Sequence, residues 1–214
     1  MSYESDSFPP MHGGGPAPRI LFLPGAGGDP AFWRPVGERL PANWEKVYFR
    51  WPGLGNKAAE PFVRGFDDLV NRVVAKLGRR ADLVAQSMGG IVAVRVALEH
   101  PAKVRRLVLV ATSGGVDVAG LGGAEWRPNY RREFPQAADW ILRERPDYTA
   151  EIPRITAPTL LVWGDNDPVS PVAVAEYLAS LLPNATLRVI AGGDHNFACD
   201  RADEVAPLVA AHLS

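Results

Sequence analysis

A serine stands at an abrupt junction between a strand pattern and a helix pattern, and this junction constrains the fold more than any other feature of the chain. The run 81–85 (ADLVA) is typical of a strand, and the run 91–98 (IVAVRVAL) is typical of a buried helix. Ser87 lies at the corner between them, with Ala85 two residues before it and Gly89 two residues after it. Small flanking residues suit so sharp a corner, because larger side chains would collide with the strand or the helix. The sequence therefore predicts a serine held in a cramped backbone conformation, a placement suited to a nucleophile.

Length, charge and cysteine content narrow the class of protein. The chain has 214 residues, enough for one sizeable core, and we expect a single domain over residues 19–214. A net charge of −1 gives no reason to expect nucleic acid or an anionic membrane surface as a partner. The single cysteine, Cys199, excludes an internal disulfide and a cysteine-based zinc cluster. No apolar run approaches the roughly 20 residues that span a bilayer, so we expect no membrane association.

The first 18 residues differ in composition from the rest. Residues 1–18 are rich in Ser, Pro and Gly, and they lack the positive start and apolar stretch of a secretory signal. A segment of this composition buries too little surface to offset its ordering entropy. We therefore expect a mobile N-terminal tail and a cytoplasmic protein.

Short strand patterns alternate with helical patterns from Arg19 onward. The expected strands are 20–23, 46–50, 81–85, 106–111, 159–163 and 186–190, and the expected helices are 31–40, 66–77, 91–100, 171–182 and 202–213. This alternation predicts an α/β fold, a doubly wound and mostly parallel six-stranded sheet with helices on both faces. Functional side chains of such sheets lie beyond the carboxyl ends of the strands, so candidate residues should directly follow strands, as Ser87 does.

Residues 114–155 interrupt the alternation. The segment is longer than a connection needs, and it carries glycines and several aromatic residues among many charges. We expect a small, mostly helical lid over the strand ends. A poorly ordered insertion is the alternative, which the aromatic residues disfavour.

A serine nucleophile needs a base within hydrogen-bond reach, and the chain has four histidines. His12 lies in the expected tail, His100 ends the helix that follows the serine, and His212 lies in the last helix. His195 alone follows a strand, in a loop with two glycines that can carry the ring to the top of the sheet. His195 is therefore the candidate general base.

The base needs an acidic partner that orients its ring. Asp165 and Asp167 both follow the strand 159–163, and Asp165 could cap the turn there with its own side chain. Asp167 stands closer to the next helix and further into the expected mouth of the site. Asp194 adjoins His195 and is therefore badly placed to meet its ring.

The Ala-x-Ser-x-Gly corner at 85–89 resembles the nucleophile elbow of the α/β-hydrolase superfamily, written Gly-x-Ser-x-Gly, with Ala85 in place of the first glycine. The order Ser87, Asp167, His195 is that of the superfamily, and the spacing Asp-x-x-x-Pro resembles its acid-bearing turn. The resemblance implies Asp167 as the acid. Asp117 is the main alternative, because some members place their acid after the preceding strand.

The resemblance also implies an oxyanion hole made of backbone amides. Met88 supplies one amide at the start of the helix after Ser87. The loop after the first strand (Pro24-Gly25-Ala26-Gly27) resembles the superfamily's His-Gly-x loop, with Pro24 where histidine is frequent. The second donor is then the amide of Ala26.

Similarity to compact members of the superfamily implies a serine hydrolase that cleaves a small or medium carboxylic ester or thioester through an acyl-enzyme on Ser87. Two alternatives remain open. One is a C–C bond hydrolase or lyase of the same fold, and the other is a non-enzymatic member that senses a ligand.

Further expectations concern the ligands. Four tryptophans are candidates for an apolar acyl pocket, namely Trp33, Trp51, Trp126 and Trp140. The expected partner is a small-molecule ester or thioester, and neither a metal nor an organic cofactor is implied. The sequence does not indicate an oligomeric state.

Overall fold

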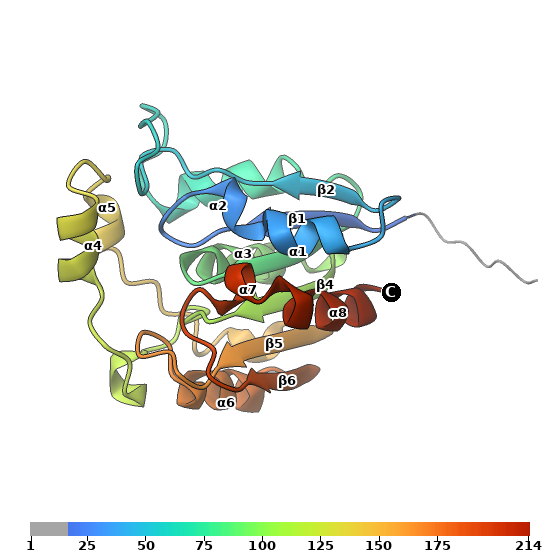
Figure 1. Ribbon diagram of the computed structural model, residues 1–214. Helices are drawn as coiled ribbons and strands as arrows, with labels where there is room; N and C mark the ends of the chain where they lie inside the picture. The colour runs from blue at the N-terminus through green and yellow to red at the C-terminus, as the bar shows by residue number, and fades with distance from the viewer. Residues whose placement is uncertain (1–16) are drawn as a thin grey trace, which may run out of the picture.

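The structure, a computed structural model, describes residues 17–214 and contains one six-stranded sheet (Figure 1). The strand order is β2-β1-β3-β4-β5-β6, and every neighbouring pair is parallel. The strands are β1 (Arg19–Leu23), β2 (Glu45–Tyr48), β3 (Ala81–Gln86), β4 (Val104–Val110), β5 (Thr159–Gly164) and β6 (Ala185–Ile190). The predicted six-stranded α/β fold is confirmed, and the sheet is parallel throughout. The expected mobile tail lies almost wholly outside the described residues.

Helices cover both faces of the sheet (Figure 1). One face packs against α2 (Phe66–Val74), α3 (Met88–Glu99) and α6 (Val172–Leu181). The other packs against α1 (Arg34–Arg39), α7 (Phe197–Asp200) and α8 (Ala202–Leu213). Short 3-10 turns precede α1 (Pro30–Trp33) and follow α3 (Pro101–Lys103). Every residue of β3 and β5 is buried, which explains why those strands read as nearly continuous apolar runs.

Two helices differ from the predicted ones in extent, at positions where proline or glycine occurs. The expected helix over 31–40 divides into a 3-10 turn and α1, and a proline occupies the first or second position of each piece. The expected helix over 66–77 ends at Val74, and the chain turns through Gly78 with a left-handed φ of 62°.

The segment between β4 and β5 contains only short helices among the described residues. These are η3 (Ala119–Leu121), α4 (Arg127–Glu133), α5 (Trp140–Arg143) and η4 (Ile152–Arg154). In Figure 1, α4 and α5 stand at the left of the molecule, whereas the chain enters β1 at the right. The two helices therefore lie toward the carboxyl ends of the parallel strands. The expected mostly helical character is not found, because these helices cover fewer than half of residues 114–155. The lid role remains a proposal.

A buried carboxylate lies near the opposite ends of β3 and β4. Asp82 is fully buried, and Arg105 donates to both of its oxygens, from Nε to Oδ1 at 2.9 Å and from Nη2 to Oδ2 at 2.5 Å. Arg105 also donates to the carbonyl of Leu213 at the end of α8. Burial raises the pKa of Asp82 although Arg105 opposes the shift. This one guanidinium therefore joins two neighbouring strands to the C-terminal helix.

We predict that Arg105→Met lowers the free energy of unfolding by about 3–5 kcal/mol, because it removes the side chain that donates to both oxygens of the buried Asp82 carboxylate. Urea denaturation followed by circular dichroism measures the change. The double variant with Asp82→Leu should recover much of the loss.

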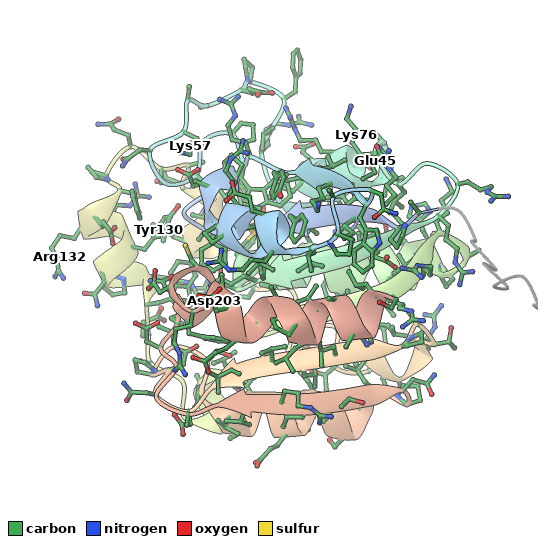
Figure 2. The ribbon with its side chains drawn as sticks, turned by 45° about the vertical axis from the view of Figure 1, so that its right-hand side comes forward. Glu45, Lys57, Lys76, Tyr130, Arg132 and Asp203 are labelled. Carbon is green, nitrogen blue, oxygen red and sulfur yellow. The ribbon has the colours of Figure 1, made fainter. Side chains whose placement is uncertain are left out.

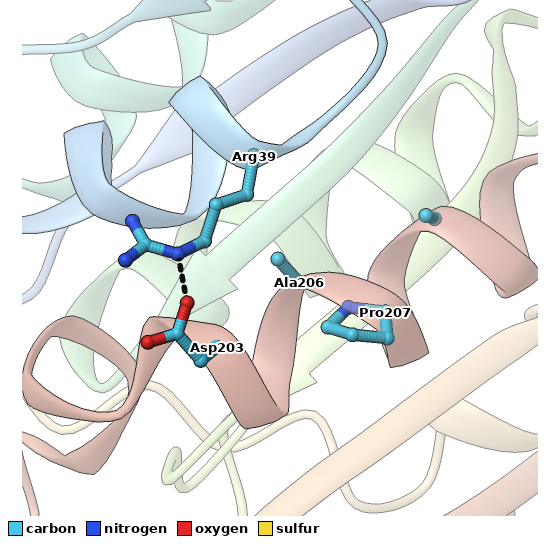
Figure 3. A pocket seen from close by; sticks show the side chains of 5 residues that line it. Arg39, Asp203, Ala206 and Pro207 are labelled. Atoms are coloured by element: carbon cyan, nitrogen blue, oxygen red, sulfur yellow. Dashed lines mark hydrogen bonds and ion pairs between the residues drawn. The ribbon is translucent and has the colours of Figure 1, made fainter.

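The matched control is Arg39→Gln. Arg39 of α1 pairs with Asp203 of α8 at 2.5 Å beside a small cavity of about 210 Å³ (Figure 3). Both side chains are exposed to water, so this variant should leave the unfolding curve nearly unchanged. Equal losses in the Arg39 and Arg105 variants would contradict the prediction.

Candidate active site

The backbone at Ser87 is left-handed, with φ 50° and ψ −125°. Only this residue separates the end of β3 from the start of α3, so the whole change of direction falls on it. The amide of Ser87 donates to the carbonyl of Val110 at 3.0 Å, and the hydroxyl of Thr112 donates to the carbonyl of Ser87 at 2.5 Å. The neighbouring strand β4 and the residues after it thus hold the predicted corner in place.

The close approach of α3 to the loop after β1 explains why Gly89 follows the corner. A Cβ added at Gly89 would lie 2.5 Å from the carbonyl oxygens of both Leu23 and Pro24, so α3 packs directly on the loop after β1. At Gly25 an added Cβ would lie 3.0 Å from the Cβ of Ser87. By contrast, Ala85 is fully buried in β3 and belongs to the same apolar cluster as Leu23. Its methyl group is accommodated there.

The structure brings Ser87, His195 and Asp167 together. Nε2 of His195 lies 2.9 Å from Oγ of Ser87, and Nδ1 of His195 lies 2.7 Å from Oδ2 of Asp167. Both are hydrogen-bond distances. The Asp167 side chain is fully buried, whereas 23% of the His195 side chain remains exposed. The arrangement joins a hydroxyl, an imidazole and a carboxylate by hydrogen bonds, and it is open to solvent at the histidine.

Two backbone amides hold Asp167 for this contact. Its Oδ1 accepts hydrogen bonds from the amides of Val169 at 2.8 Å and Ser170 at 3.1 Å, which leaves Oδ2 for His195. These bonds and the buried position fix the carboxylate in one orientation.

The other candidate acids bond elsewhere. Asp165 accepts from the amide of Gly192 at 2.5 Å, Asp117 from the amide of Ala119 at 3.1 Å, and Asp194 from the amide of Asn196 at 2.8 Å. The bonds of Asp117 and Asp194 stabilise turns, and that of Asp165 joins the loop after β5 to the loop after β6. Among the aspartates of residues 17–214, Asp167 alone is bonded to the His195 ring.

The loop that carries His195 is held from two sides. Gly192 has a left-handed φ of 68°, and the amide of Asn166 donates to the carbonyl of Gly193 at 2.9 Å. From the elbow side, Nε2 of Gln86 donates to the carbonyl of His195 at 3.2 Å. Sequence reasoning missed Gln86 and Thr112, because a polar side chain next to a strand end gives no signal of which loop it will meet.

The two other histidines in residues 17–214 lie away from this arrangement. His100 follows α3, and its amide bonds back to the carbonyl of Val96. The ring of His212 in α8 is 3.2 Å from the carbonyl of Pro158, and burial lowers its pKa. His12 lies outside the described residues.

Ala26 and Met88 both line the cavity that contains Ser87. Within residues 17–214, neither backbone amide is bonded to an acceptor. The Tyr130 hydroxyl of α4 donates to the carbonyl of Ala26 at 2.8 Å and accepts from the amide of Gly55 at 2.9 Å. Burial raises the pKa of this hydroxyl. Tyr130 therefore joins α4 to the loop that contains Ala26.

The cavity above Ser87 has a volume of about 950 Å³, and its wall includes side chains from the segment between β4 and β5. Of the four candidate tryptophans, Trp126 lines this cavity. The structure does not bring Trp33, Trp51 or Trp140 to it. Trp33 and Trp51 are buried in two different core clusters, and their indoles donate to the carbonyls of Leu23 and Pro24 respectively. Trp140 packs edge-on against Phe66.

Sequence reasoning also missed several wall residues. Tyr130 and Phe134 line the cavity together with Trp126, and their spacing of four residues was the available helical signal. Among residues 17–214, no three His, Cys, Asp or Glu side chains are grouped to hold a metal ion. Over the same range, no helix is long and apolar enough to cross a membrane.

Known proteins share this fold and parts of this sequence. The polyketide synthase ThaQ of Burkholderia thailandensis is 30% identical over 94% of this chain, which spans only 12% of that protein. A pimeloyl-[acyl-carrier protein] methyl ester esterase of Neisseria meningitidis serogroup B is 27% identical, over 89% of this chain and 90% of the esterase. A putative carbamate hydrolase of Caulobacter vibrioides is 26% identical, over 87% of each chain.

Solved structures show the same architecture. A hydrolase from Pseudomonas aeruginosa has a TM-score of 0.75 at 21% identity and covers 92% of this chain and 90% of its own. A carboxylesterase from Bacillus subtilis has a TM-score of 0.72 at 19% identity and covers 92% and 84%. These likenesses establish the fold.

Two family models match the sequence. The model described as "alpha/beta hydrolase fold" matches residues 114–202, and the model of the "Alpha/beta hydrolase family" matches residues 20–148. The second match covers more than half of the chain, and the protein therefore belongs to the α/β hydrolase family.

Proposed function

We propose that the protein is a serine hydrolase that cleaves a small or medium carboxylic ester or thioester. The observation that carries the proposal is the pair of hydrogen-bond distances at His195, 2.9 Å to Ser87 and 2.7 Å to Asp167. Relatives that act on esters support the substrate class, among them the Neisseria pimeloyl-[acyl-carrier protein] methyl ester esterase.

The proposed reaction has two stages. In the first, Oγ of Ser87 attacks the carbonyl carbon while Nε2 of His195 takes the hydroxyl proton. The tetrahedral intermediate then expels the alcohol or thiol, which receives that proton, and an acyl-enzyme remains on Ser87. In the second stage, His195 takes a proton from water as the water attacks the acyl carbon, and the acid leaves when the proton returns to Ser87. Asp167 stabilises the imidazolium in both stages.

The amides of Ala26 and Met88 would hold the oxyanion. Met88 is the first residue of α3, a 12-residue helix, so its amide lies at the positive end of the helix dipole. Loss of one such donor typically costs about 3 kcal/mol of transition-state stabilisation. The hydrogen bond from Tyr130 to the carbonyl of Ala26 supports the position of the loop.

Helices α4 and α5 would form the lid of this site. Trp126, Tyr130 and Phe134 from the α4 region line the cavity, and Ile141 of α5 does so too. These side chains give the cavity an apolar wall that suits an acyl chain.

We predict that a fluorophosphonate probe labels the native protein at Ser87 and that Ser87→Ala abolishes the labelling, because the probe reacts with an activated serine. Fluorescent gel analysis and intact-protein mass spectrometry measure the adduct. Release of p-nitrophenol from esters of graded chain length then reports turnover.

The control is Ser113→Ala, which removes a second hydroxyl from the same cavity wall. The Ser113 hydroxyl accepts from the amide of Gly115 and is not bonded to His195, so labelling should persist. A native protein that resists the probe would refute the acyl-enzyme. Good labelling with no ester turnover would favour the C–C hydrolase or lyase alternative.

We predict that Asp167→Asn lowers kcat by about 10⁴, because the amide no longer stabilises the imidazolium or fixes its tautomer. Steady-state hydrolysis of p-nitrophenyl butyrate measures the change. Asp117→Asn alters a matched carboxylate that is not bonded to His195 and should retain most of the activity. Reversal of this order would move the acid role to Asp117.

A further inference from the structure

Two arginines line the same cavity as Ser87, and neither is needed for the proposed chemistry. Arg127 is the first residue of α4, and Arg145 follows α5. Apolar groups would suffice to hold an uncharged acyl chain. Arg145 is exposed and 22% of the Arg127 side chain is exposed, so the two groups add positive charge to this wall without being deeply buried.

Arg127 has one buried donor without an acceptor. Its Nη1 lies 3.0 Å from Oε1 of Glu125, and the same oxygen accepts the backbone amide of Arg127 at 3.0 Å. The guanidinium carbon lies 4.8 Å from the centre of the Trp126 ring. Glu125 and Trp126 thus hold the group in one orientation. Nε of Arg127 is buried and has no hydrogen-bond partner within the described part of the chain.

Arg145 adds a second positive charge beside the first. Its Nη1 donates to two carbonyls, those of Leu142 at 2.7 Å and Glu144 at 3.0 Å. Burial and the charge of Arg127 lower the pKa of Arg145, and Glu125 opposes them. Both arginines in turn lower the pKa of Glu125. Arg127, Arg145 and Glu125 together have one excess positive charge, and Arg127 alone of the two arginines is hydrogen-bonded to the Glu125 carboxylate.

Other carboxylates on the cavity wall do not supply the missing partner. None of them is among the charges that shift the pKa of Arg145. Most accept hydrogen bonds elsewhere: Asp29 from Lys57, Glu144 from the amide of Phe66, Asp117 from the amide of Ala119 and Asp147 from the amide of Thr149. Glu133 is exposed at the end of α4.

We propose that Arg127 and Arg145 bind an oxyanion carried by the substrate away from the bond that is cleaved. The two guanidinium groups on the cavity wall and their excess of positive charge over Glu125 fit a carboxylate or a phosphate monoester, whose oxygens accept charge-assisted hydrogen bonds from guanidinium groups. This inference rests on the proposed hydrolysis at Ser87, and it assigns the cavity a preference for anionic esters or thioesters over neutral ones.

Two matched substrate pairs test the proposal and locate the anion. The first pair, the mono-p-nitrophenyl ester of adipic acid and p-nitrophenyl heptanoate, differs by a carboxylate on the acyl chain. The second pair, butyryl thioesters of 4′-phosphopantetheine and of pantetheine, differs by a phosphate on the leaving group. We expect the native protein to have the higher kcat/KM for the anionic member of one pair, and that pair identifies the part of the substrate that carries the anion.

Arg127→Gln and Arg145→Gln should each reduce kcat/KM for the preferred anionic substrate by about 10- to 100-fold, the range for a lost charged hydrogen bond. The loss should appear mainly in KM, because the contact is made equally in the ground and transition states. Turnover of the neutral member should stay within about twofold. Arg143→Gln is the matched control: Arg143 lies in α5 between the two positions in sequence, is exposed, and does not line the cavity.

Fluorophosphonate labelling separates this test from that of the proposed function. If the native protein and both variants label normally but prefer no anionic substrate, the oxyanion site is wrong and the serine hydrolase remains. A preference that survives both substitutions also overturns it. If the native protein does not label, the proposed hydrolysis itself fails, and the oxyanion site fails with it.

Discussion

The left-handed backbone at Ser87 is the constraint on which the rest of the site depends. Non-glycine residues avoid this conformation at a cost of about 1–3 kcal/mol, so the surroundings must enforce it. Here β3 and α3 meet at a single residue, β4 accepts the serine amide, and Gly89 allows α3 to lie against the loop after β1. Packing between the sheet and α3 thus stabilises the backbone conformation that places the Ser87 hydroxyl in the cavity.

Parallel strands explain how residues so distant in sequence meet at that hydroxyl. His195 follows β6 and Asp167 follows β5, which are neighbouring strands at one edge of the sheet. Ser87 follows β3, two strands away from β5. Because all strands are parallel, their carboxyl ends lie at the same end of the sheet. Short loops therefore suffice to bring the three side chains together. Gln86 adds a direct tie between the elbow and the histidine loop.

Much of this arrangement could be predicted from the sequence, for a physical reason. Buried parallel strands are short apolar runs ended by turn residues, so β1, β4 and β5 were recognisable without tertiary information. The expectation that functional groups follow strands then limited the choice of histidine to His195.

What escaped prediction depends on which way a side chain points. Trp33 and Trp51 are large and apolar like Trp126, but the first two are fully buried in the core and only Trp126 lines the cavity. Arg127 likewise cannot be distinguished by sequence from Arg132, which lies in the same helix. The Arg132 side chain projects from α4 away from the sheet (Figure 2). Sequence spacing within a seven-residue helix does not distinguish the side that faces the cavity from the side that faces water.

The hydroxyl of Tyr130 has a consequence for how the cavity opens. It bonds at once to the carbonyl of Ala26 and to the amide of Gly55, so α4 is fastened to the loops that follow β1 and β2. Any outward movement of α4 must either break both bonds or pull the Ala26 loop along with it. The position of α4 and the position of the Ala26 loop are thereby mechanically coupled, through one phenol, without any residue in common with Ser87, His195 and Asp167.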